Sequence, residues 1–244
     1  MSAVNQSRDR IVQCMFDRIA GRYDLLNRVI SFRMDSRWRR QVIRELLTQS
    51  APRVLDLGTG TGDLVFDAAM ASKGSGTFIG LDFSLPMLRL ALTKRRKFSH
   101  VGSTEFVSGS ATIMPFKNNF FDGVMTAFVL RNVSDLTSLF VEAHRVLRPG
   151  GKFVSLDMFP PSPTWFSALY SVYFHCVMPR IGALLAGDRD AYQYLSDSVR
   201  QFHPPEKVTS LIEQAGFQGV VVRKFLRGAV CMHIARKPSR ASRS

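Results

Sequence analysis

The sequence has few cysteines and no long hydrophobic run. Its three cysteines, Cys14, Cys176 and Cys231, are widely spaced and lack the spacing of metal ligands, so neither a disulfide framework nor a zinc site is indicated and we expect no metal. The N-terminus lacks the apolar core of a signal peptide, and no stretch is long and apolar enough to span a bilayer. We therefore expect a reducing, cytoplasmic location, and contact with the inner face of a membrane stays open.

Acidic residues are also few. The 244 residues include 33 Lys and Arg against 19 Asp and Glu, a formal net charge of +14, which favours an anionic partner such as nucleic acid or acidic lipid. Basic residues gather at 33–40, 94–97 and 236–243, although solvated helix faces and a frayed terminus explain such runs equally well. Aromatic and basic residues do not alternate there as in a base-stacking platform, so we expect no nucleic acid.

A glycine-rich segment is the most informative stretch. Residues 53–63, Arg-Val-Leu-Asp-Leu-Gly-Thr-Gly-Thr-Gly-Asp, predict a buried strand, a tight turn and a helix that begins near Asp63. Glycine lets a ligand lie directly on the backbone. Compared with the dinucleotide-binding motif, Asp63 replaces the third glycine and Asp56 precedes the first. This acidic edge would repel a pyrophosphate but suits the ammonium and sulfonium groups of S-adenosylmethionine.

A second acidic residue supports this cofactor. The predicted strand 77–82 ends in Asp82, 20 residues beyond Gly62, where a carboxylate can accept hydrogen bonds from both ribose hydroxyls. A glycine loop alone is weak evidence, because a plain strand-to-helix turn has the same composition. The loop and Asp82 together resemble the cofactor-binding motifs of class I methyltransferases.

From Arg53 onward, predicted strands and helices alternate, which is typical of an α/β protein with a mostly parallel, Rossmann-like sheet. After the first strand, further strands are expected at 77–82, 105–109, 121–128, 152–156, 220–226 and 229–236, and helices at 63–71, 86–97, 135–147 and 205–214. Residues 147–151 predict a turn before the fifth strand. The last two strands form a hairpin, and an antiparallel last strand is more typical of methyltransferases than of dinucleotide dehydrogenases.

Three segments lie outside this alternation. Residues 8–30 read as an amphipathic helix interrupted at Gly21, and 36–47 as a second helix; both precede the first strand, so we expect them to pack across the mouth of the cofactor cleft. An aromatic-rich insertion at 158–202 predicts one or two helices that cap the crevice, with ordinary core packing as the alternative. The expected parts of this one domain are an N-terminal helical lid at 1–50, a cofactor-binding core at 51–157, a substrate cap at 158–202, the C-terminal part of the core at 203–237 and a basic tail at 238–244.

Ligands of such sheets bind beyond the carboxyl ends of the strands, at the topological switch point. That rule gathers these segments around one crevice: Gly58–Thr61, Asp82, Ser110–Ala111, Ala127–Asn132 and Asp157. The candidate cofactor-binding residues are Asp56, Gly58, Gly60, Thr61, Asp82, Ser110 and Ala111.

Four segments outside the glycine loop carry a more specific resemblance: Phe16 to Asn27, Trp38 to Arg40, Leu130 to Val133, and Gly187 to Arg200. With them the chain resembles the UbiE/MenG/COQ5 family of quinone-biosynthesis C-methyltransferases over essentially residues 12–236. The resemblance implies methyl transfer from S-adenosylmethionine to a ring carbon of a polyprenylated quinol, giving menaquinone or a ubiquinone precursor. It also implies cofactor contacts at Thr61, at Asp82 for the ribose, and at Ser110 and Ala111 beside the adenine.

The chain departs from that family pattern at the end of the fourth strand. Where the family commonly has Ser-Phe-Gly, this sequence has Ala127-Phe128-Val129. Ala127 cannot donate a hydrogen bond from its side chain, so we expect an altered affinity for the cofactor.

Methylation of carbon requires an electron-rich ring, and loss of the phenol proton makes the ring richer. Arg131 stays protonated and cannot be a simple base, so we assign it to stabilising the phenolate or polarising a water. Asn132 would orient the ring oxygen, and Asp157 and Tyr23 are candidates for the proton relay. The structural alternatives are an ion pair with an acid at a strand end for Arg131, a turn cap for Asn132 and packing for Tyr23.

Three other functions stay open. A nucleic-acid methyltransferase would fit the positive charge, but the chain lacks the Asp/Asn-Pro-Pro-Tyr tetrad and the Pro-Cys nucleophile of such enzymes. A methyltransferase for another lipid-like or small-molecule acceptor and a non-catalytic component of a quinone-synthesis assembly are the other two. The expected partners are the polyprenylated quinol, an anionic membrane surface and a second copy of the chain in a homodimer.

Overall fold

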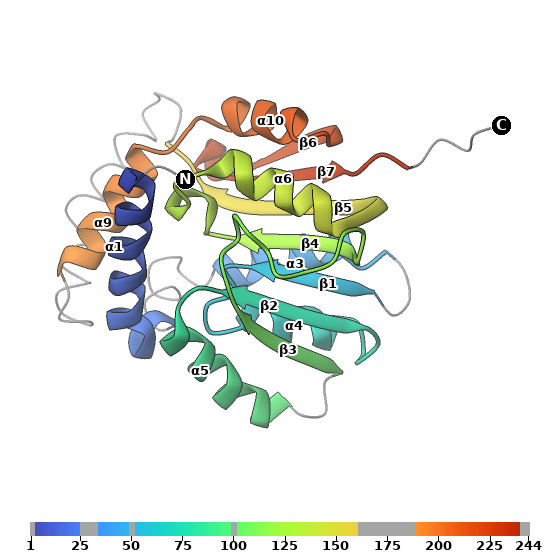
Figure 1. Cartoon of the computed structure of the whole chain (residues 1–244), viewed down its shortest axis with the longest axis horizontal. Helices are drawn as coiled ribbons and strands as arrows, with labels where there is room; N and C mark the ends of the chain where they lie inside the picture. Colours follow the sequence, from blue (N-terminus) through green and yellow to red (C-terminus); the bar gives the residue numbers. More distant parts are fainter. Residues whose placement is uncertain (1–2, 25–33, 49–51, 99–101, 161–188, 240–244) are drawn as a thin grey trace.

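The apolar segments that alternate along the chain pair into one seven-stranded sheet, with helices packed against it (Figure 1). The structure is a computed structural model that describes residues 3–24, 34–48, 52–98, 102–160 and 189–239. In this part of the chain the strand order is β3-β2-β1-β4-β5-β7-β6. The strands are β1 Arg53–Leu57, β2 Thr77–Asp82, β3 Ser103–Ser108, β4 Phe121–Ala127, β5 Leu147–Met158, β6 Gln218–Phe225 and β7 Val230–Arg236.

The directions of the strands confirm the predicted fold class. β1 to β5 run parallel to one another, and β7 pairs antiparallel with both β5 and β6. The result is a Rossmann-like α/β sheet whose last strand in the chain is antiparallel.

The central strands are apolar on both faces, as a parallel sheet covered by helices requires. Leu55 and Leu57 of β1 pack in one core layer with α6 (Leu136–Val146) and α10 (Pro205–Gln214). Val54 packs in the opposite layer with α3 (Met34–Leu46) and α4 (Asp63–Ala71). Because successive side chains of a strand point to opposite faces, one short apolar run serves both layers.

Three further helices border the sheet: α1 Ala3–Ile19, α5 Leu85–Arg95 and α9 Arg189–Arg200. Figure 1 shows α1 and α9 at the end of the sheet where the parallel strands finish, with α5 along the β3 side. The first helix begins five residues earlier than the predicted residue 8, and Gly21 lies in a 3-10 turn, Ala20–Arg22, which confirms the predicted break. The remainder of the segment predicted as 8–30 lies outside the described residues after Asp24.

The prediction of a turn at 147–151 is wrong, because β5 begins at Leu147. Phe121 pairs with Leu147 and Gly123 with Lys152, so residues 148–151 form a bulge in β5 opposite Asp122. Two backbone hydrogen bonds hold this part of the chain: Gly150 N to Lys237 O and Lys237 N to Gly151 O, both at 2.9 Å.

The insertion at 158–202 is described only in part. Residues 161–188 lie outside the described residues, and α9 confirms a helix in the final third of the insertion. The division of the chain into lid, core, cap and tail stays a prediction.

Gly76 turns the chain from α4 into β2 with a φ of +102°, and a Cβ there would lie 2.4 Å from the carbonyl oxygen of Pro52. That oxygen accepts the hydrogen bond from Thr77 N that begins β2. Gly76→Ala should therefore lower the free energy of unfolding by about 3 kcal/mol or more, measured by urea denaturation, because strain and clash add.

Gly219→Ala is the matched control for this substitution. Gly219 has a φ of +62° with nothing within 4 Å of the added Cβ, so only the left-handed backbone should cost free energy, about 1 kcal/mol. Equal losses in the two variants would contradict the importance of the Pro52 contact.

Candidate active site

The candidate site is a cavity of about 440 Å³ at the carboxyl ends of β1, β2 and β4. Residues from α1, from the glycine loop and from the segments that follow β3 and β4 line it. Among the predicted cofactor-binding residues, Gly58, Asp82, Ser110 and Ala111 line the cavity, and the predicted catalytic residue Asn132 does so too. The crevice inferred from the strand order is therefore present with these residues around it.

The glycine loop is held tightly where it leaves β1. The N–H groups of Gly58 and Thr59 both donate to Leu81 O, at 2.8 and 3.0 Å. Gly58 has a φ of +66°, and a Cβ there would lie 2.5 Å from Val129 Cγ2. Position 58 therefore requires glycine for its backbone angle and for the close approach of Val129. Val129, noted as a departure from the family pattern, packs directly on the cofactor loop.

Asp82 connects the loop to the next helix. Its carboxylate accepts hydrogen bonds from Gly60 N at 2.7 Å and from Ser84 N at 2.8 Å. Burial raises the pKa of Asp82, and the backbone N–H donors oppose that rise. Each carboxylate oxygen keeps a further lone pair that can accept from a ribose hydroxyl.

Asp56 is a buried acid without a full set of partners. Its side chain is 2% exposed, and among the described residues its Oδ2 has no hydrogen-bond partner. Burial raises the pKa of Asp56 to about 8. A cationic ligand would remove the cost of ionising this group, which fits the amino and sulfonium charges of S-adenosylmethionine.

The first helix, α1, packs on the cofactor residues and lines the cavity, as predicted. The same prediction is wrong for the second helix, because the apolar side of α3 packs with α4 against a face of the sheet. Gln13 Nε2 donates to Phe83 O at 2.8 Å, and Ser84 Oγ donates to Asp17 Oδ1 at 2.5 Å. The Tyr23 ring lies 3.7 Å from where a Cβ on Gly60 would stand, and it meets Phe16 edge to face. Tyr23 thus has the packing contacts named as its structural alternative.

Thr61 takes part in a charged network that the sequence did not reveal. Its hydroxyl donates to Asp24 Oδ1 at 2.6 Å and accepts from Lys94 Nζ at 2.8 Å. Lys94 also pairs with Asp24 and with Asp63. Lys94 belongs to the basic run 94–97, and the sequence of this run does not reveal that Lys94 pairs with acids inside the protein. The network ties the end of the N-terminal segment to the glycine loop.

Arg131 and Asp157 form a buried ion pair. Arg131 Nη1 donates to Asp157 Oδ1 at 2.5 Å, and Arg131 and Asp157 are 7% and 1% exposed. Met158 N donates to the same oxygen at 2.7 Å. The expected alternative for Arg131, an acid at a strand end, is therefore present. Its Nε has no hydrogen-bond partner among the described residues and keeps one donor available.

Asn132 is oriented by two contacts of its side-chain amide. Its Nδ2 donates to Phe128 O at 3.3 Å, and its Oδ1 accepts from the Tyr194 hydroxyl at 3.2 Å. Burial raises the pKa of Tyr194, which keeps the phenol protonated as a donor. The Phe128 contact closes the turn that precedes Asn132, whereas the structural alternative was a cap on the turn that follows. Tyr194, in α9, was missed as a site residue, although it lies in the segment 187–200.

A model of the ubiE/COQ5 methyltransferase family matches residues 1–237. The chain belongs to the ubiE/COQ5 methyltransferase family. Its relatives include a demethylmenaquinone methyltransferase of Thermus thermophilus, 40% identical over 92% of this chain and 100% of the relative. Another, from Staphylococcus saprophyticus, is 37% identical over 96% of this chain and 100% of the relative. A ubiquinone/menaquinone biosynthesis C-methyltransferase UbiE of Desulfotalea psychrophila is 39% identical over 91% of this chain and 88% of the relative.

Solved structures share the fold at lower identity. A possible histamine N-methyltransferase of Thermotoga maritima has a TM-score of 0.63 at 18% identity and covers 93% of this chain and 99% of its own. The [4+2]-cyclase SpnF has a TM-score of 0.68 at 15% identity, and the match covers 95% of this chain and 97% of the cyclase. A cyclase on the same fold shows that the fold does not determine the reaction.

Membership of the family makes the chain an S-adenosylmethionine-dependent methyltransferase. The cavity fits this cofactor by its chemistry, because the carboxylate of Asp82 lines it and can accept from ribose hydroxyls. Asp56 is buried at the end of β1 behind the glycine loop and does not line the cavity. The individual contacts assigned to Gly58, Gly60, Thr61, Ser110 and Ala111 stay predictions.

The raised pKa of Asp56 should make stability fall with pH. Between its ordinary pKa and about 8, the folded protein keeps a proton that the unfolded chain has lost, so stability decreases as pH rises through this window, by up to about 1.4 kcal/mol per pH unit. Asp56→Asn removes this titration. Denaturation of both proteins at about pH 5 and about pH 7 should show that the variant gains stability relative to wild type at the higher pH.

An equal pH dependence in the two proteins would contradict a proton on Asp56. Saturation with S-adenosylmethionine provides the second readout. A cationic ligand beside Asp56 should release the proton, so calorimetry in buffers of different ionisation enthalpy should detect proton release in wild type and less in Asp56→Asn.

Proposed function

We propose that this enzyme methylates a ring carbon of a polyprenylated quinol, either demethylmenaquinol or a benzoquinol precursor of ubiquinone. The observation that carries the proposal is the turn after β4, where Arg131 holds a buried acid and Asn132 presents its amide at the cofactor cavity. The names of the relatives, which match over nearly the whole chain, support the same substrate class.

The residues of this turn would prepare the ring for attack. S-adenosylmethionine supplies a methyl group on a sulfonium, which accepts electrons when the carbon–sulfur bond breaks. Asn132, oriented by Tyr194 and Phe128, would hold the ring oxygen. Arg131 would stabilise the phenolate through its Nε–H, which has no partner among the described residues, and Asp157 keeps the guanidinium in place. The methyl group would pass to the ring carbon and leave S-adenosylhomocysteine, and the proton displaced from that carbon would pass to water.

Tyr23 and the cofactor-binding residues have supporting tasks in this proposal. Tyr23 covers Gly60 and would exclude water from the reacting atoms or relay the phenol proton. Asp82 would hold the ribose, Ser110 and Ala111 the adenine, and Asp56 would face the cationic part of the cofactor. Alignment of the methyl group with the ring carbon would supply much of the rate enhancement.

The proposed partners follow from the substrate. A polyprenyl tail resides in a bilayer, so we include peripheral contact with an anionic membrane surface on the cytoplasmic side. A homodimer is a separate part of the proposal. In the described part of the chain, no helix combines the length and the apolar character needed to cross a membrane.

The substrate class is tested by methyl transfer from labelled S-adenosylmethionine to reduced demethylmenaquinol and to the matching benzoquinol in detergent. Product from either quinol is expected, and the ratio of the two rates identifies the pathway. Cofactor binding without product from either quinol would contradict the quinol assignment.

The catalytic task of Arg131 requires a variant that leaves no buried charge unpaired. Arg131→Ala alone would strand Asp157 and destabilise the fold by about 3–5 kcal/mol. The double variant Arg131→Gln/Asp157→Asn removes both charges, so it should fold and bind S-adenosylmethionine. Its turnover of the quinol should nevertheless fall by about a hundredfold or more. Turnover equal to wild type would leave the pair with a structural role only.

A further inference from the structure

The outer face of α5 combines arginines with exposed apolar side chains. At helical spacing this face carries Leu85, Arg89, Leu92 and Arg96, the last in the 3-10 turn Arg96–Phe98 that continues the helix. Leu85 and Leu92 are 53% and 46% exposed. Single exposed leucines are ordinary, but here the same helix face alternates leucine and arginine over its whole length.

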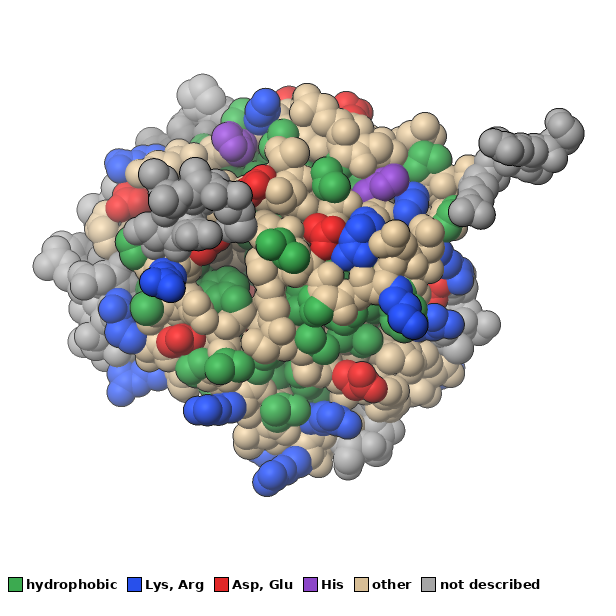
Figure 2. All heavy atoms as spheres, viewed as in Figure 1, with side chains coloured by type: hydrophobic (Ala, Val, Ile, Leu, Met, Phe, Trp, Pro, Cys, Tyr) green, Lys and Arg blue, Asp and Glu red, His purple; other side chains and the backbone are tan. Residues whose placement is uncertain are grey.

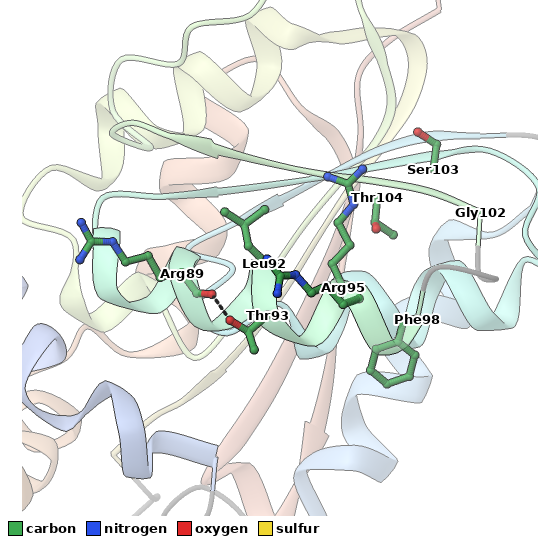
Figure 3. A pocket seen from close by; sticks show the side chains of 9 residues that line it. Arg89, Leu92, Thr93, Arg95, Phe98, Gly102, Ser103 and Thr104 are labelled. Carbon is green, nitrogen blue, oxygen red and sulfur yellow. Dashed lines mark hydrogen bonds between the residues drawn. The ribbon is translucent and has the colours of Figure 1, made fainter.

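A groove runs between this helix and β3, the edge strand of the sheet. It has a volume of about 720 Å³ and is lined by Arg89, Arg95 and Arg96 from the helix and by Ser103 and Thr104 from the strand. Figure 3 shows Leu92 between Arg89 and Arg95 along the helix. The side chains of the three arginines have no hydrogen bond or ion pair with any residue that the structure describes. Guanidinium and hydroxyl groups arranged in this way suit phosphate groups.

The arginines on this face outnumber the acids beside them. The sequence from Phe83 to Thr104 contains no Asp or Glu. Exposed Glu105 follows on β3 and forms no ion pair with these arginines within the described residues. Lys94 lies on the inner side of the same helix, where it pairs with Asp24 and Asp63. The helix thus directs one cation toward the cofactor loop and leaves its arginines facing solvent.

A bilayer fits this face better than a nucleic acid. Phe98 lines the groove, but one face of its ring is already stacked on Phe66 at 4.8 Å, which limits its use for base stacking. Figure 2 shows Lys and Arg side chains with hydrophobic side chains between them along the lower edge, where Figure 1 places α5. Exposed leucines between arginines suit the boundary between headgroups and acyl chains.

We propose that the α5 face, defined as Leu85, Arg89, Leu92, Arg95 and Arg96, docks the protein on a bilayer that contains anionic phospholipid. Lipid phosphates would occupy the groove, and the leucines would enter the headgroup boundary. The helix begins beside Ser84, which bonds to Asp82 at the cofactor cavity, and the groove lies at its other end beside the first residues of β3, so one helix would connect the bilayer with the cavity. The benefit for a polyprenylated substrate rests on the proposed function, whereas the binding itself does not.

Sedimentation of the full chain with vesicles tests the proposal without any quinol. The protein should bind vesicles of phosphatidylglycerol mixed with phosphatidylcholine, and should bind vesicles of phosphatidylcholine alone far more weakly. Arg89→Ala/Arg96→Ala should reduce affinity for the anionic vesicles about 25-fold, or about fivefold for each charge removed. Lys117→Ala/Lys207→Ala removes two exposed charges on other elements and should bind like wild type. Equal losses in both double variants, or equal binding to both vesicles, would overturn the proposal.

Leu92→Ser separates a bilayer from other polyanions, because it changes no charge. It should weaken vesicle binding about fivefold and leave binding to a single-stranded RNA oligonucleotide unchanged. Binding of the RNA through Arg89 and Arg96, without vesicle binding, would assign the groove to nucleic acid and overturn the proposal.

Turnover of a detergent-dispersed quinol by the arginine variants keeps the two proposals distinguishable. It should equal that of wild type, and a parallel loss of turnover would show that the arginines support the fold instead. If no form of the protein methylates the quinol while the vesicle results stand, the proposed function fails and the docking surface does not.

Discussion

The carboxylate of Asp82 is the group on which the arrangement of the site depends. It ends β2 and accepts one hydrogen bond from the glycine loop and one from the start of α5. Ser84, bound to it, donates in turn to Asp17 of α1. A single buried group therefore fixes the loop, the following helix and the N-terminal helix around one cavity. Burial raises the pKa of Asp82, so ionising this carboxylate costs free energy. A ligand that donates hydrogen bonds to the carboxylate would stabilise its ionised form.

The excess of positive charge has two different structural meanings. Arg39 is largely enclosed and pairs with Asp35 and Asp67, and Lys94 serves the glycine loop. These cations compensate acids of α3, of α4 and of the N-terminal segment. The arginines on the outer face of α5 form no ion pair among the described residues. The basic run 94–97 therefore contains both a lysine paired inside the protein and arginines exposed on its surface. A net charge read from the sequence cannot separate these two uses, because the separation depends on which side of a helix each residue occupies.

The elements of the fold were largely predictable because they follow from local patterns. The helices at 63–71 and 205–214 and the strand ending in Asp82 lie where the apolar spacing and the glycines predicted them. Contacts between distant segments were not predictable in this way. Tyr194 reaches Asn132 across 62 positions, and Asp24 reaches Thr61 across 37. The extent of β5 was misjudged for the same reason, because the glycines at 150 and 151 are held by Lys237.

The turn after β4 combines two costly features that stability alone does not explain. A buried ion pair such as Arg131 with Asp157 contributes little net stability, because desolvation offsets much of the attraction between the charges. Phe128, three residues earlier, has a φ of +63°, which is unfavourable for an aromatic residue. Phe128 O accepts from Asn132, and Phe128 N donates to Leu156 O, so the strained backbone itself orients the amide at the cavity. The strained backbone orients Asn132, and the ion pair fixes Arg131 beside it. An apolar turn of the same shape would cost less free energy to fold, so the polar residues of this turn point to chemistry at the cavity.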